Sequence, residues 1–461
     1  MNKKIVYKTS ILMTKLSDLI LKTINPAGGT SLPGMVARKI SPDILSYLVS
    51  QRKKELISIT GTNGKTTTSG FIASIIKNNG FTLAHNRKGA NMLNGITAAI
   101  VKESSLNATL DVDYCLLESD EAYLPKLTNE IKPDIILVTN LFRDQLDRYG
   151  ELDTTAKKIR EAINNTSSAK RFKLLLNADD PIVSNITPDD KNINKIYYGL
   201  EEVIIKNSNE EVESPKEIAS CACGQKFQYE KIFYGHLGFY YCSCGIKRPL
   251  PHIKAKAVVD TDCSTLDIST ESGEVFSVKI DMPGLYNIYN ALGAIATALE
   301  LGIAPNDIAK GLSSYDTVFG RAENISLNGK QAIIQLIKNP IGATEVLRTV
   351  NIDPNSRLLI IINDNYADGR DVSWLWDANF ELLSNHVNEI VVSGVRASDM
   401  AVRLKYAGID PDRIKVIENM DKALDYSVKV TNNDEKLYIL PTYTALLKLQ
   451  GILRKYNKKS F

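Results

Sequence analysis

A short stretch around residue 60 limits what this chain can fold into more than any other part of its sequence. The apolar run 56–60 ends abruptly at the sequence GTNGKT (61–66), and small, helix-compatible residues follow it. This order predicts a buried strand, a tight glycine turn and the start of a helix. The backbone N–H groups of such a turn and the N-terminus of the helix together form a concave site that favours a phosphate chain.

In this interpretation the polar residues of the turn have separate roles. Lys65 would reach the β- and γ-phosphates of a nucleotide, and the Thr66 hydroxyl would ligate Mg²⁺. The turn is shorter than the usual G-x-x-x-x-G-K-[ST] pattern. However, an ordinary strand–turn–helix would not need a Gly-Lys-Thr triplet, so we expect a nucleoside triphosphate. The predicted phosphate-binding residues are Gly61, Thr62, Asn63, Gly64, Lys65, Thr66 and Thr67.

Composition indicates a globular protein of more than one domain. The chain has 461 residues, 44% of them hydrophobic and 24% charged, so we expect two or three domains. No apolar run approaches the roughly 18 residues of a membrane span. Lys15 and Asp18 interrupt any signal-peptide core. Four of the six cysteines fall within 24 residues, which is not the spread of a disulfide framework and indicates the reducing cytoplasm.

The first 54 residues differ from the rest of the chain in charge. They contain ten Lys or Arg against Asp18 and Asp43, a local charge of +8, whereas the whole chain carries +3. Apolar residues recur there at helical spacing and predict an amphipathic helix. The segment either lies near an anionic surface or a pyrophosphate, or is a solvated basic helix.

From residue 55 to about 198, predicted strands and helices alternate. The strands are 112–118, 134–139 and 172–177, and the helices are 66–78, 92–104 and 153–165. Alternation of this kind predicts a mostly parallel sheet with helices on both faces and active residues at the carboxyl ends of the strands. Glu118 ends one strand and is suited to hold Mg²⁺. The other interpretation, acids that complement a helix N-terminus, fits Asp120 and Glu121 better than Glu118.

Two matched cysteine pairs interrupt this pattern within 199–255. The sequences CACG (221–224) and CSCG (242–245) flank an aromatic, hairpin-like segment. Both pairs are C-x-C rather than the usual C-x₂-C, and two alternatives stay open: disulfides, or His236 in place of one cysteine. Four thiolates in two such pairs suit a tetrahedral ion. The predicted ligands of a structural zinc are Cys221, Cys223, Cys242 and Cys244.

A second α/β domain is predicted after a hinge at 319–323. Before it, the sequence from 283 opens an alanine-rich helix that runs to about 301. Beyond it, strands at 331–337, 358–363, 388–393 and 437–440 alternate with helices. The resulting length of about 140 residues is normal for a domain.

Five motifs follow one another in the order of a known enzyme family. They are ITGTNGKTTT (59–68), LLESDEA (116–122), LNADDP (176–181), PGLYNIYNALGA (283–294) and FGRAE (319–323). With them, the chain resembles the Mur ligase family of ATP-dependent, amide-forming enzymes. The implied fold is α/β: a Mur-ligase-like parallel-sheet ATPase domain with an inserted zinc ribbon, and a C-terminal α/β domain. The expected boundaries are 1–54 for a basic helical segment packed on the ATPase domain, 55–318 for the ATPase domain with the ribbon at 199–255, and 319–461.

Further motifs narrow the resemblance to the branch of ligase subunits that work with a GatD-type glutaminase. They include GGTSLPGMVARK (28–39), RKGANMLNGI (87–96), NLFRDQLDRYGE (140–151), KNPIGATEVL (338–347), DNYADGRDVSWLWD (364–377) and LPTYTALLKL (440–449). The resemblance implies that ATP and Mg²⁺ activate the α-carboxyl of the D-glutamate in lipid II as an acyl phosphate. Ammonia from the glutaminase then gives D-isoglutamine at the inner face of the membrane.

The resemblance also implies roles for individual residues. Thr66 and Glu118 would serve magnesium, Asn177 and Asn287 would lie on the adenine side, and Arg321 would approach the γ-phosphate. Lys65 and Glu118 would act in phosphoryl transfer. Asp368 or Asp371 would complete the catalytic triad of the partner glutaminase. Trp374 and Trp376, beside these aspartates, are either interface anchors or core residues.

Two other functions are weaker interpretations of the same sequence. One is a stand-alone amino-acid ligase of the muramyl or folylpolyglutamate type. The other is a zinc ribbon that binds nucleic acid. The near-neutral remainder of the chain and the scattered lysines and arginines around the cysteines argue against the second, and no nucleic acid partner is expected.

Overall fold

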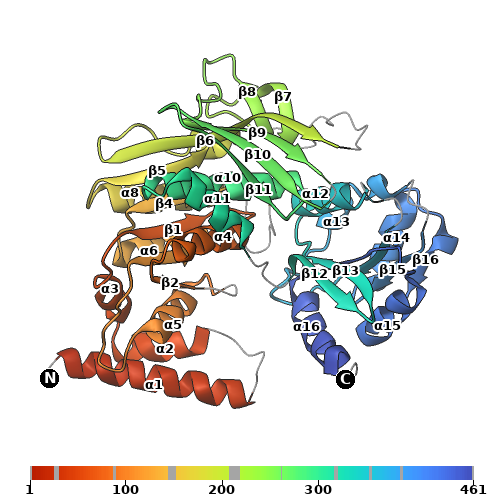
Figure 1. The fold of residues 1–461 in the computed structure, drawn as a ribbon, viewed down its shortest axis with the longest axis horizontal. Helices are drawn as coiled ribbons and strands as arrows, with labels where there is room; N and C mark the ends of the chain where they lie inside the picture. The colour runs from red at the N-terminus through yellow and green to blue at the C-terminus, as the bar shows by residue number, and fades with distance from the viewer. Residues whose placement is uncertain are drawn as a thin grey trace.

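The computed structural model describes residues 3–24, 31–86, 90–143, 152–206, 219–260, 262–315, 320–351, 353, 356–384 and 388–458. Two α/β units are built on separate sheets, and a small hairpin rises from the first unit (Figure 1). Phe319, the first residue of the predicted hinge, lies outside the described residues, as do residues 87–89 of one motif and residues 144–151 of another.

The first unit is a nine-stranded sheet in the order β11-β10-β9-β6-β5-β4-β1-β3-β2. Neighbouring strands from β2 to β9 pair in parallel, whereas β10 pairs antiparallel with β9 and β11. The strands are β1 Leu56–Thr60, β2 Leu83–His85, β3 Tyr114–Glu118, β4 Ile135–Val138, β5 Phe172–Asn177, β6 Ile193–Ile205, β9 Ile253–Val259, β10 Ser264–Thr270 and β11 Val275–Ile280.

Helices cover both faces of this sheet, because its central strands are apolar on both sides. In β4, Ile135 and Leu137 pack toward one hydrophobic core, and Ile136 and Val138 toward the other. One core contains α4 Lys65–Asn78, α10 Leu285–Glu300 and α11 Pro305–Ser313. The other contains α1 Lys3–Ile24, α2 Ser31–Ile40, α3 Ile44–Val49, α5 Leu93–Glu103, α6 Leu124–Glu130 and α8 Leu152–Ser167, and the short α9 Pro181–Ser184 follows β5.

The hairpin is inserted between β6 and β9 of the main sheet. It consists of β7 Gln228–Tyr234 and β8 Leu237–Tyr241, which pair antiparallel. The main sheet continues along β6 to Ile205 and resumes at Ile253. Its strands therefore overlap both ends of the range 199–255 that the sequence assigns to the ribbon.

The C-terminal unit is a six-stranded sheet in the order β12-β13-β17-β14-β15-β16. Its strands are β12 Arg321–Leu327, β13 Lys330–Gln335, β14 Arg357–Ile361, β15 Ile390–Ser393, β16 Ile414–Val416 and β17 Leu437–Pro441. Its helices are α12 Pro340–Asn351, α13 Trp374–Asp377, η1 Phe380–Leu383, α14 Ala397–Tyr406, η2 Pro411–Arg413, α15 Met420–Val430 and α16 Tyr443–Lys458. The predicted second α/β domain is confirmed, with all four of its predicted strands.

Candidate active site

The glycine turn connects β1 to α4, as predicted, and both of its glycines have backbone angles that disfavour other residues. The φ angles are +125° at Gly61 and +84° at Gly64. A Cβ atom on Gly64 would lie 1.9 Å from Oδ1 of Asn290 in α10. Since neither the conformation nor the space admits a side chain, the turn brings its backbone close to α10.

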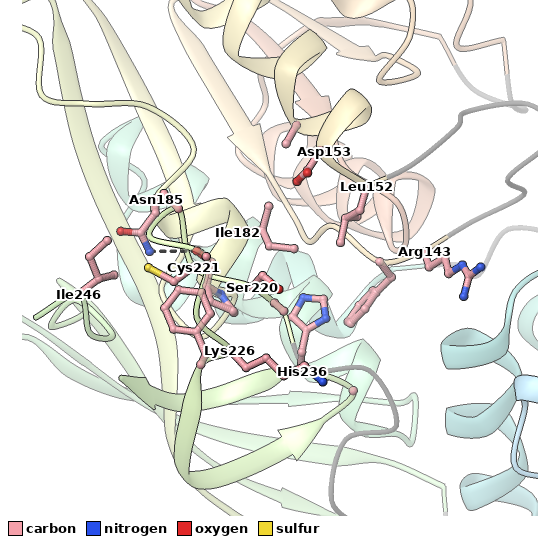
Figure 2. Close-up of a pocket in the computed structure, with 18 of the residues that line it drawn as sticks. Arg143, Leu152, Asp153, Ile182, Asn185, Ser220, Cys221, Lys226, His236 and Ile246 are labelled. Atoms are coloured by element: carbon pink, nitrogen blue, oxygen red, sulfur yellow. Dashed lines mark hydrogen bonds between the residues drawn. The ribbon is translucent and has the colours of Figure 1, made fainter. Parts of the chain in front are cut away.

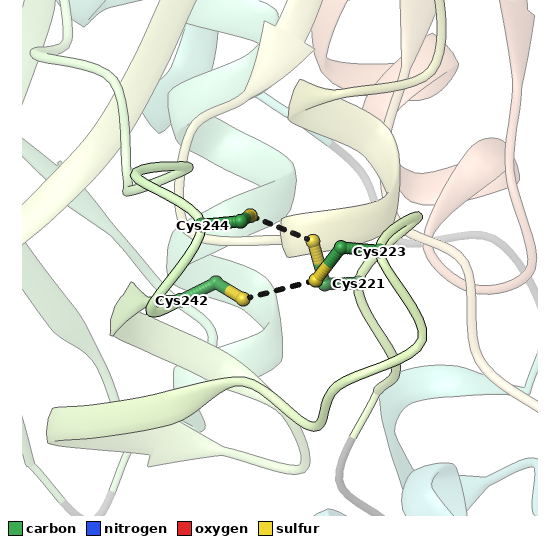
Figure 3. Close-up of side chains that lie close together, drawn as sticks. All are labelled: Cys221, Cys223, Cys242 and Cys244. Carbon is green, nitrogen blue, oxygen red and sulfur yellow. Dashed lines mark hydrogen bonds between the residues drawn. The ribbon is translucent and has the colours of Figure 1, made fainter.

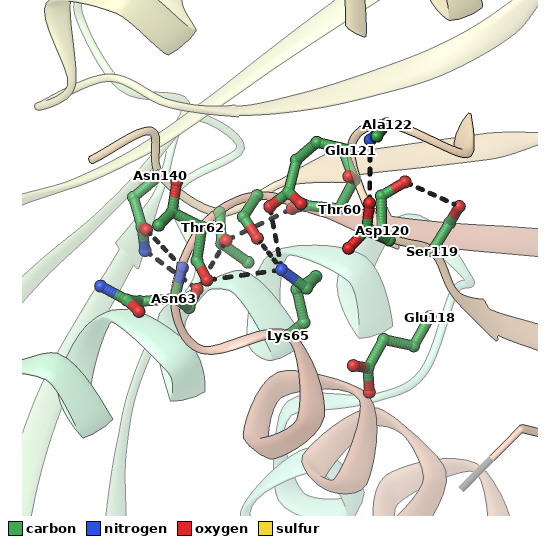
Figure 4. A network of polar contacts seen from close by, with 12 residues as sticks. Thr60, Thr62, Asn63, Lys65, Glu118, Ser119, Asp120, Glu121, Ala122 and Asn140 are labelled. Atoms are coloured by element: carbon green, nitrogen blue, oxygen red, sulfur yellow. Dashed lines mark hydrogen bonds and ion pairs between the residues drawn. The ribbon is translucent and has the colours of Figure 1, made fainter. Parts of the chain in front are cut away.

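Hydrogen bonds from the segment that follows β4 fix the turn. Thr62 N donates to Asn140 O at 2.8 Å, and Asn63 N donates to Asn140 Oδ1 at 2.9 Å. The Thr62 hydroxyl donates to Phe142 O at 3.1 Å and accepts from Phe142 N at 3.0 Å. Figure 4 shows Asn140 beside Thr62 and Asn63 of the turn. These contacts fix the turn before any ligand binds, which is the preorganisation that a phosphate site needs.

Lys65 forms an ion pair that the sequence did not reveal. Its Nζ lies 2.9 Å from Oε1 of Glu121 and also donates to the Gly61 carbonyl (Figure 4). Burial alone would lower the pKa of Lys65, but the charges of Glu121 and Asp120 outweigh it and raise that pKa. The helix α6 begins only at Leu124. The interpretation of Glu121 as a helix N-terminal acid is therefore wrong, because no acid lies in the first turn of α6 and the Glu121 carboxylate pairs with Lys65 instead.

Thr66 and Glu118 are brought together as the magnesium hypothesis requires. The Thr66 hydroxyl donates to Glu118 Oε1 at 3.2 Å. Strand pairing explains this proximity, since Ile59 at the end of β1 is aligned with Glu118 at the end of β3. A hydroxyl and a buried carboxylate beside a phosphate-binding turn are ligands that suit a hard divalent cation.

The three other predicted nucleotide contacts differ in their surroundings. Asn287 and Asn290 of α10 line a cavity of about 60 Å³ together with Asn63, Gly64 and Thr67. Asn177 is fully buried at the end of β5, where its side chain donates to Thr139 O at 3.2 Å and accepts from Asp179 N. Arg321 begins β12, and its side chain lies outside the described part of the structure.

The C-terminal unit reaches the glycine turn directly. Asn339 Nδ2 donates to Asn63 Oδ1 at 2.9 Å, and Lys338 Nζ donates to Thr62 O at 3.3 Å. Gln335, Lys338 and Glu345 of this unit also line the 60 Å³ cavity. The candidate active site therefore lies between the two units, a common location for ligand sites.

The two candidate triad aspartates have different environments. Asp368 is buried and accepts hydrogen bonds from Thr444 N at 2.7 Å, from the Thr444 hydroxyl and from Asn365 N at 3.1 Å. Asp371 is exposed, and its carboxylate accepts from Ser373 N at 2.8 Å. The hydrogen bonds from Ser373 lower the pKa of Asp371, so this aspartate is charged and open to solvent.

The four clustered cysteines face one another across two matched turns (Figure 3). The Sγ atoms lie 3.5 Å apart in the pairs Cys221–Cys244 and Cys223–Cys242, and all four lie within 4.8 Å of one another. A tetrahedral zinc with Zn–S bonds of about 2.3 Å would separate its sulfurs by about 3.8 Å. The C-x-C spacing therefore permits a four-thiolate site.

His236 lies outside that cluster. Its Nε2 atom is 3.4 Å from Oδ1 of Asp180, and its ring lies against Phe142, with 4.8 Å between centroids. Among the described residues, the only group of three or more His, Cys, Asp or Glu side chains close enough to share one metal ion is the four cysteines. The alternative in which His236 replaces a cysteine is not supported.

A buried ion pair joins the cysteine hairpin to the main sheet. Arg248 Nε donates to Asp179 Oδ1 at 2.6 Å, and Tyr289 of α10 donates to Asp179 Oδ2 at 2.7 Å. Beside the hairpin is a hollow of about 1020 Å³, walled by Cys221 and His236 on one side and by the start of α8 on the other (Figure 2). The hairpin is therefore integrated with the unit that carries the glycine turn.

Comparison with known proteins identifies the family of this chain. Residues 59–298 match the family described as Mur ligase middle domain, and residues 336–446 match MurT ligase C-terminal. The chain is 36% identical over 444 residues to the lipid II isoglutaminyl synthase (glutamine-hydrolyzing) subunit MurT of Staphylococcus aureus strain COL, covering 95% of each chain. This chain belongs to the Mur ligase family, in its MurT branch. It is thus a ligase-type enzyme of peptidoglycan synthesis.

Other relatives agree with that assignment. A MurT subunit of Streptococcus pneumoniae strain R6 is 36% identical over 430 residues, covering 92% of each chain. Among solved structures, a pseudomurein peptide ligase type C from Methanothermus fervidus has a TM-score of 0.68 at 26% identity, covering 90% of this chain and 80% of its own. MurF ligase from Thermotoga maritima, solved with ADP, has a TM-score of 0.63 at 12% identity, covering 93% and 85%, and shows a shared fold.

Proposed function

We propose that this Mur ligase uses ATP to amidate the α-carboxyl of the D-glutamate in lipid II, with ammonia from a partner glutaminase. The observation that carries this proposal is the arrangement of Lys65 and Thr66 of the glycine turn beside the buried Glu118, in a chain 36% identical to named MurT subunits. The turn supplies N–H donors and one ammonium for a triphosphate. The Thr66–Glu118 pair would hold the Mg²⁺ that neutralises charge on the phosphates.

The reaction requires an activated carboxylate, because a carboxylate ion is a poor acyl donor. Transfer of the γ-phosphoryl group to a carboxylate oxygen forms an acyl phosphate and releases ADP. Ammonia then attacks the acyl carbon, phosphate leaves with that oxygen, and an amide remains. Lys65, with a raised pKa, holds positive charge beside the transferring group and so stabilises the transition state.

We assign the partner's triad residue to Asp371 rather than Asp368. An acid that orients the histidine of another protein must be accessible, and Asp371 is exposed whereas Asp368 is engaged by Thr444. Large aromatic side chains nearby are also exposed: Trp376 is 52% exposed and its ring lies 5.6 Å from that of Tyr406. Exposed aromatic residues of this kind often anchor protein interfaces. Trp374 instead packs on the core of the C-terminal unit.

The four-cysteine cluster would hold a structural zinc that keeps the hairpin folded. Its thiol spacing fits a tetrahedral ion, and each pair is followed by a glycine with positive φ, Gly224 at +87° and Gly245 at +96°. All four ligand positions would be occupied by sulfur, so the ion has no open position for a substrate.

Reconstitution tests the proposed function. The chain is co-purified with a GatD-type glutaminase and supplied with lipid II, ATP, Mg²⁺ and glutamine, and amidated lipid II is measured by mass spectrometry. We expect amidation that requires both subunits with glutamine but only this chain with free ammonia. Turnover with an amino acid in place of ammonia, and none with glutamine plus partner, would instead identify a stand-alone amino-acid ligase.

A further inference from the structure

Helix α1 presents its most apolar side to solvent. Residues spaced by three, four and seven positions share one side of a helix. Six large apolar side chains of α1 follow this spacing, and each is between 44% and 61% exposed. They are Ile5, Leu12, Met13, Leu16, Leu19 and Ile20.

Helix α2, which packs against α1, adds two exposed apolar side chains. Leu32 and Met35, three residues apart in α2, are 48% and 54% exposed. The two helices lie together at the end of the molecule opposite the cysteine hairpin (Figure 1). We call these two side chains and the six of α1 the apolar face. Large apolar side chains exposed together on neighbouring helices commonly mark an interaction site.

The opposite side of α1 fixes the helix against the protein. The Tyr7 ring stacks on that of Tyr47, with 3.8 Å between centroids, and the Tyr7 hydroxyl donates to Asp43 Oδ2 at 2.7 Å. Ile11 is fully buried, and the Ser10 hydroxyl donates to Ala37 O at 2.9 Å. Because these contacts set the rotation of α1, the apolar face cannot turn inward without breaking them.

Positive charge accompanies the apolar face. Lys3, Lys4, Lys8 and Lys15 lie along α1, and the same helix contains one acid, Asp18. Lys15 Nζ donates to Ser104 O at 2.5 Å, which places its charge at the end of α5. A second copy of the chain placed on this face would bring like charges together. An anionic bilayer satisfies both the apolar side chains and the lysines.

We propose that α1 and α2 dock this chain on the surface of an anionic bilayer. The apolar face enters the boundary between headgroups and acyl chains, and Lys3, Lys4 and Lys8 meet lipid phosphates. The helices lie in the plane of the surface, and none of those described is long and apolar enough to cross a membrane. This inference deepens the proposed function, since a lipid-linked substrate resides at such a surface, but it requires no nucleotide, partner or turnover.

Vesicle co-sedimentation of the full chain without ATP tests the proposal. We expect binding to phosphatidylglycerol vesicles to be at least about tenfold tighter than to phosphatidylcholine vesicles, because several lysines contribute. High salt should weaken it. Absence of binding to the anionic vesicles, or equal binding to both, would overturn the proposal. A failed amidation assay would leave this binding result unaffected, and a failure to bind vesicles would not by itself contradict the proposed amidation.

Substitutions test whether the apolar face is the surface that binds the vesicles. The triple variant Leu16→Gln/Leu19→Gln/Ile20→Gln should bind anionic vesicles at least about tenfold more weakly, since it removes three buried apolar side chains from the bound state. Its melting temperature and ATP hydrolysis should be unchanged. The control is Val275→Gln, which removes an apolar side chain that is 79% exposed on β11, away from the apolar face, and which should bind like the original chain. Undiminished binding by the triple variant would overturn the proposal, as would a dimer in solution that this variant dissociates.

Discussion

Among single residues, Lys65 shows best how the glycine turn is prepared for a nucleotide. It is buried, yet Glu121 lies 2.9 Å from its Nζ and the pKa of the ammonium is raised. The lysine therefore stays protonated across the physiological pH range. A fixed positive charge in a region shielded from water interacts more strongly with phosphate than one in solvent.

Lys65→Ala should reduce ATP hydrolysis by at least about 10²-fold, because it removes the charge that stabilises phosphoryl transfer. Phosphate release measures this, with Lys206→Ala as a surface control. The single variant also leaves Glu121 buried without its ammonium, which costs stability. The double variant Lys65→Ala/Glu121→Gln also removes the unpaired carboxylate charge of Glu121. We expect this double variant to stay folded and to be inactive. Hydrolysis retained by a folded double variant would be incompatible with the proposed loop.

Asp371→Asn should remove glutamine-driven amidation and spare ammonia-driven amidation. Asparagine keeps the size of the side chain but cannot stabilise a charged histidine of the partner. Both assays are run on the complex. Asp368→Asn is the contrasting variant: it weakens the hydrogen bonds to Thr444 and should lower the melting temperature, with the two activities reduced together. If Asp371→Asn keeps full glutamine use, the assignment is wrong.

The sequence predicted the glycine turn and the place of Glu118 at the end of a strand, but it did not predict that Glu121 pairs with Lys65. Glu118, Asp120 and Glu121 are neighbours in the chain, and periodicity does not show which carboxylate turns toward β1. That depends on the register of β3 against β1, where Ile59 is aligned with Glu118. The remote partners of the turn, Asn140 and Asn339, are likewise set by tertiary structure.

At the scale of elements, the cysteine hairpin is fixed to the main sheet by a buried charge. Burial raises the pKa of Asp179, and Arg248, 2.6 Å away, opposes that rise. Removing one partner of such a pair typically costs about 3–5 kcal/mol. The hairpin core itself is small, consisting of Cys221, Phe227, Tyr240 and Cys242 with three partly buried neighbours. So small a core needs a further constraint, which a metal would supply.

Substituting Cys221 and Cys244 with Ser should release about one zinc per chain, because a serine hydroxyl is a poor zinc ligand. Metal content by mass spectrometry and the melting temperature check this. Cys263→Ser is the matched control, since Cys263 is not in the cluster, and it should retain the metal. Purified chain that holds no zinc, or a double variant that keeps it, would contradict the assignment.

Sequence patterns predicted some strands better than others, for a physical reason. Strands β1, β4 and β17 are buried along their whole length, and most of their residues are apolar. By contrast, β9 and β10 alternate buried and exposed residues, and β6 pairs with β9 across the inserted hairpin. Pairing between segments so far apart in the chain leaves no local pattern, so the full width of the sheet was not predicted.

At the scale of the whole molecule, the two units meet at the glycine turn. The Asn339 side chain links the turn to α12: its Oδ1 accepts from Gly342 N at 2.8 Å, and its Nδ2 donates to Asn63 Oδ1. One side chain thus ties the first turn of a C-terminal helix to the nucleotide loop. Relative motion of the units would change the geometry of the site.

Asn339→Ser should raise the KM for ATP several-fold with little loss of stability. Serine preserves the cap on α12 but is too short to reach Asn63, so the effect isolates the contact between the units. Asn339→Ala removes both contacts and should cost a further roughly 1 kcal/mol of folding stability. Steady-state kinetics and thermal unfolding separate the two effects. Unchanged kinetics for both variants would show that this contact does not support nucleotide binding.

The central claim is that ATP phosphorylates a carboxylate before ammonia attacks it. Its most direct test is to trace where the oxygen atoms of that carboxylate go. Lipid II with both oxygens of the D-glutamate α-carboxyl labelled with oxygen-18 is amidated by the complex, and the released phosphate is analysed by mass spectrometry. Passage through an acyl phosphate predicts one labelled oxygen in each phosphate formed and one retained in each amide. Amide formation with unlabelled phosphate would contradict the account.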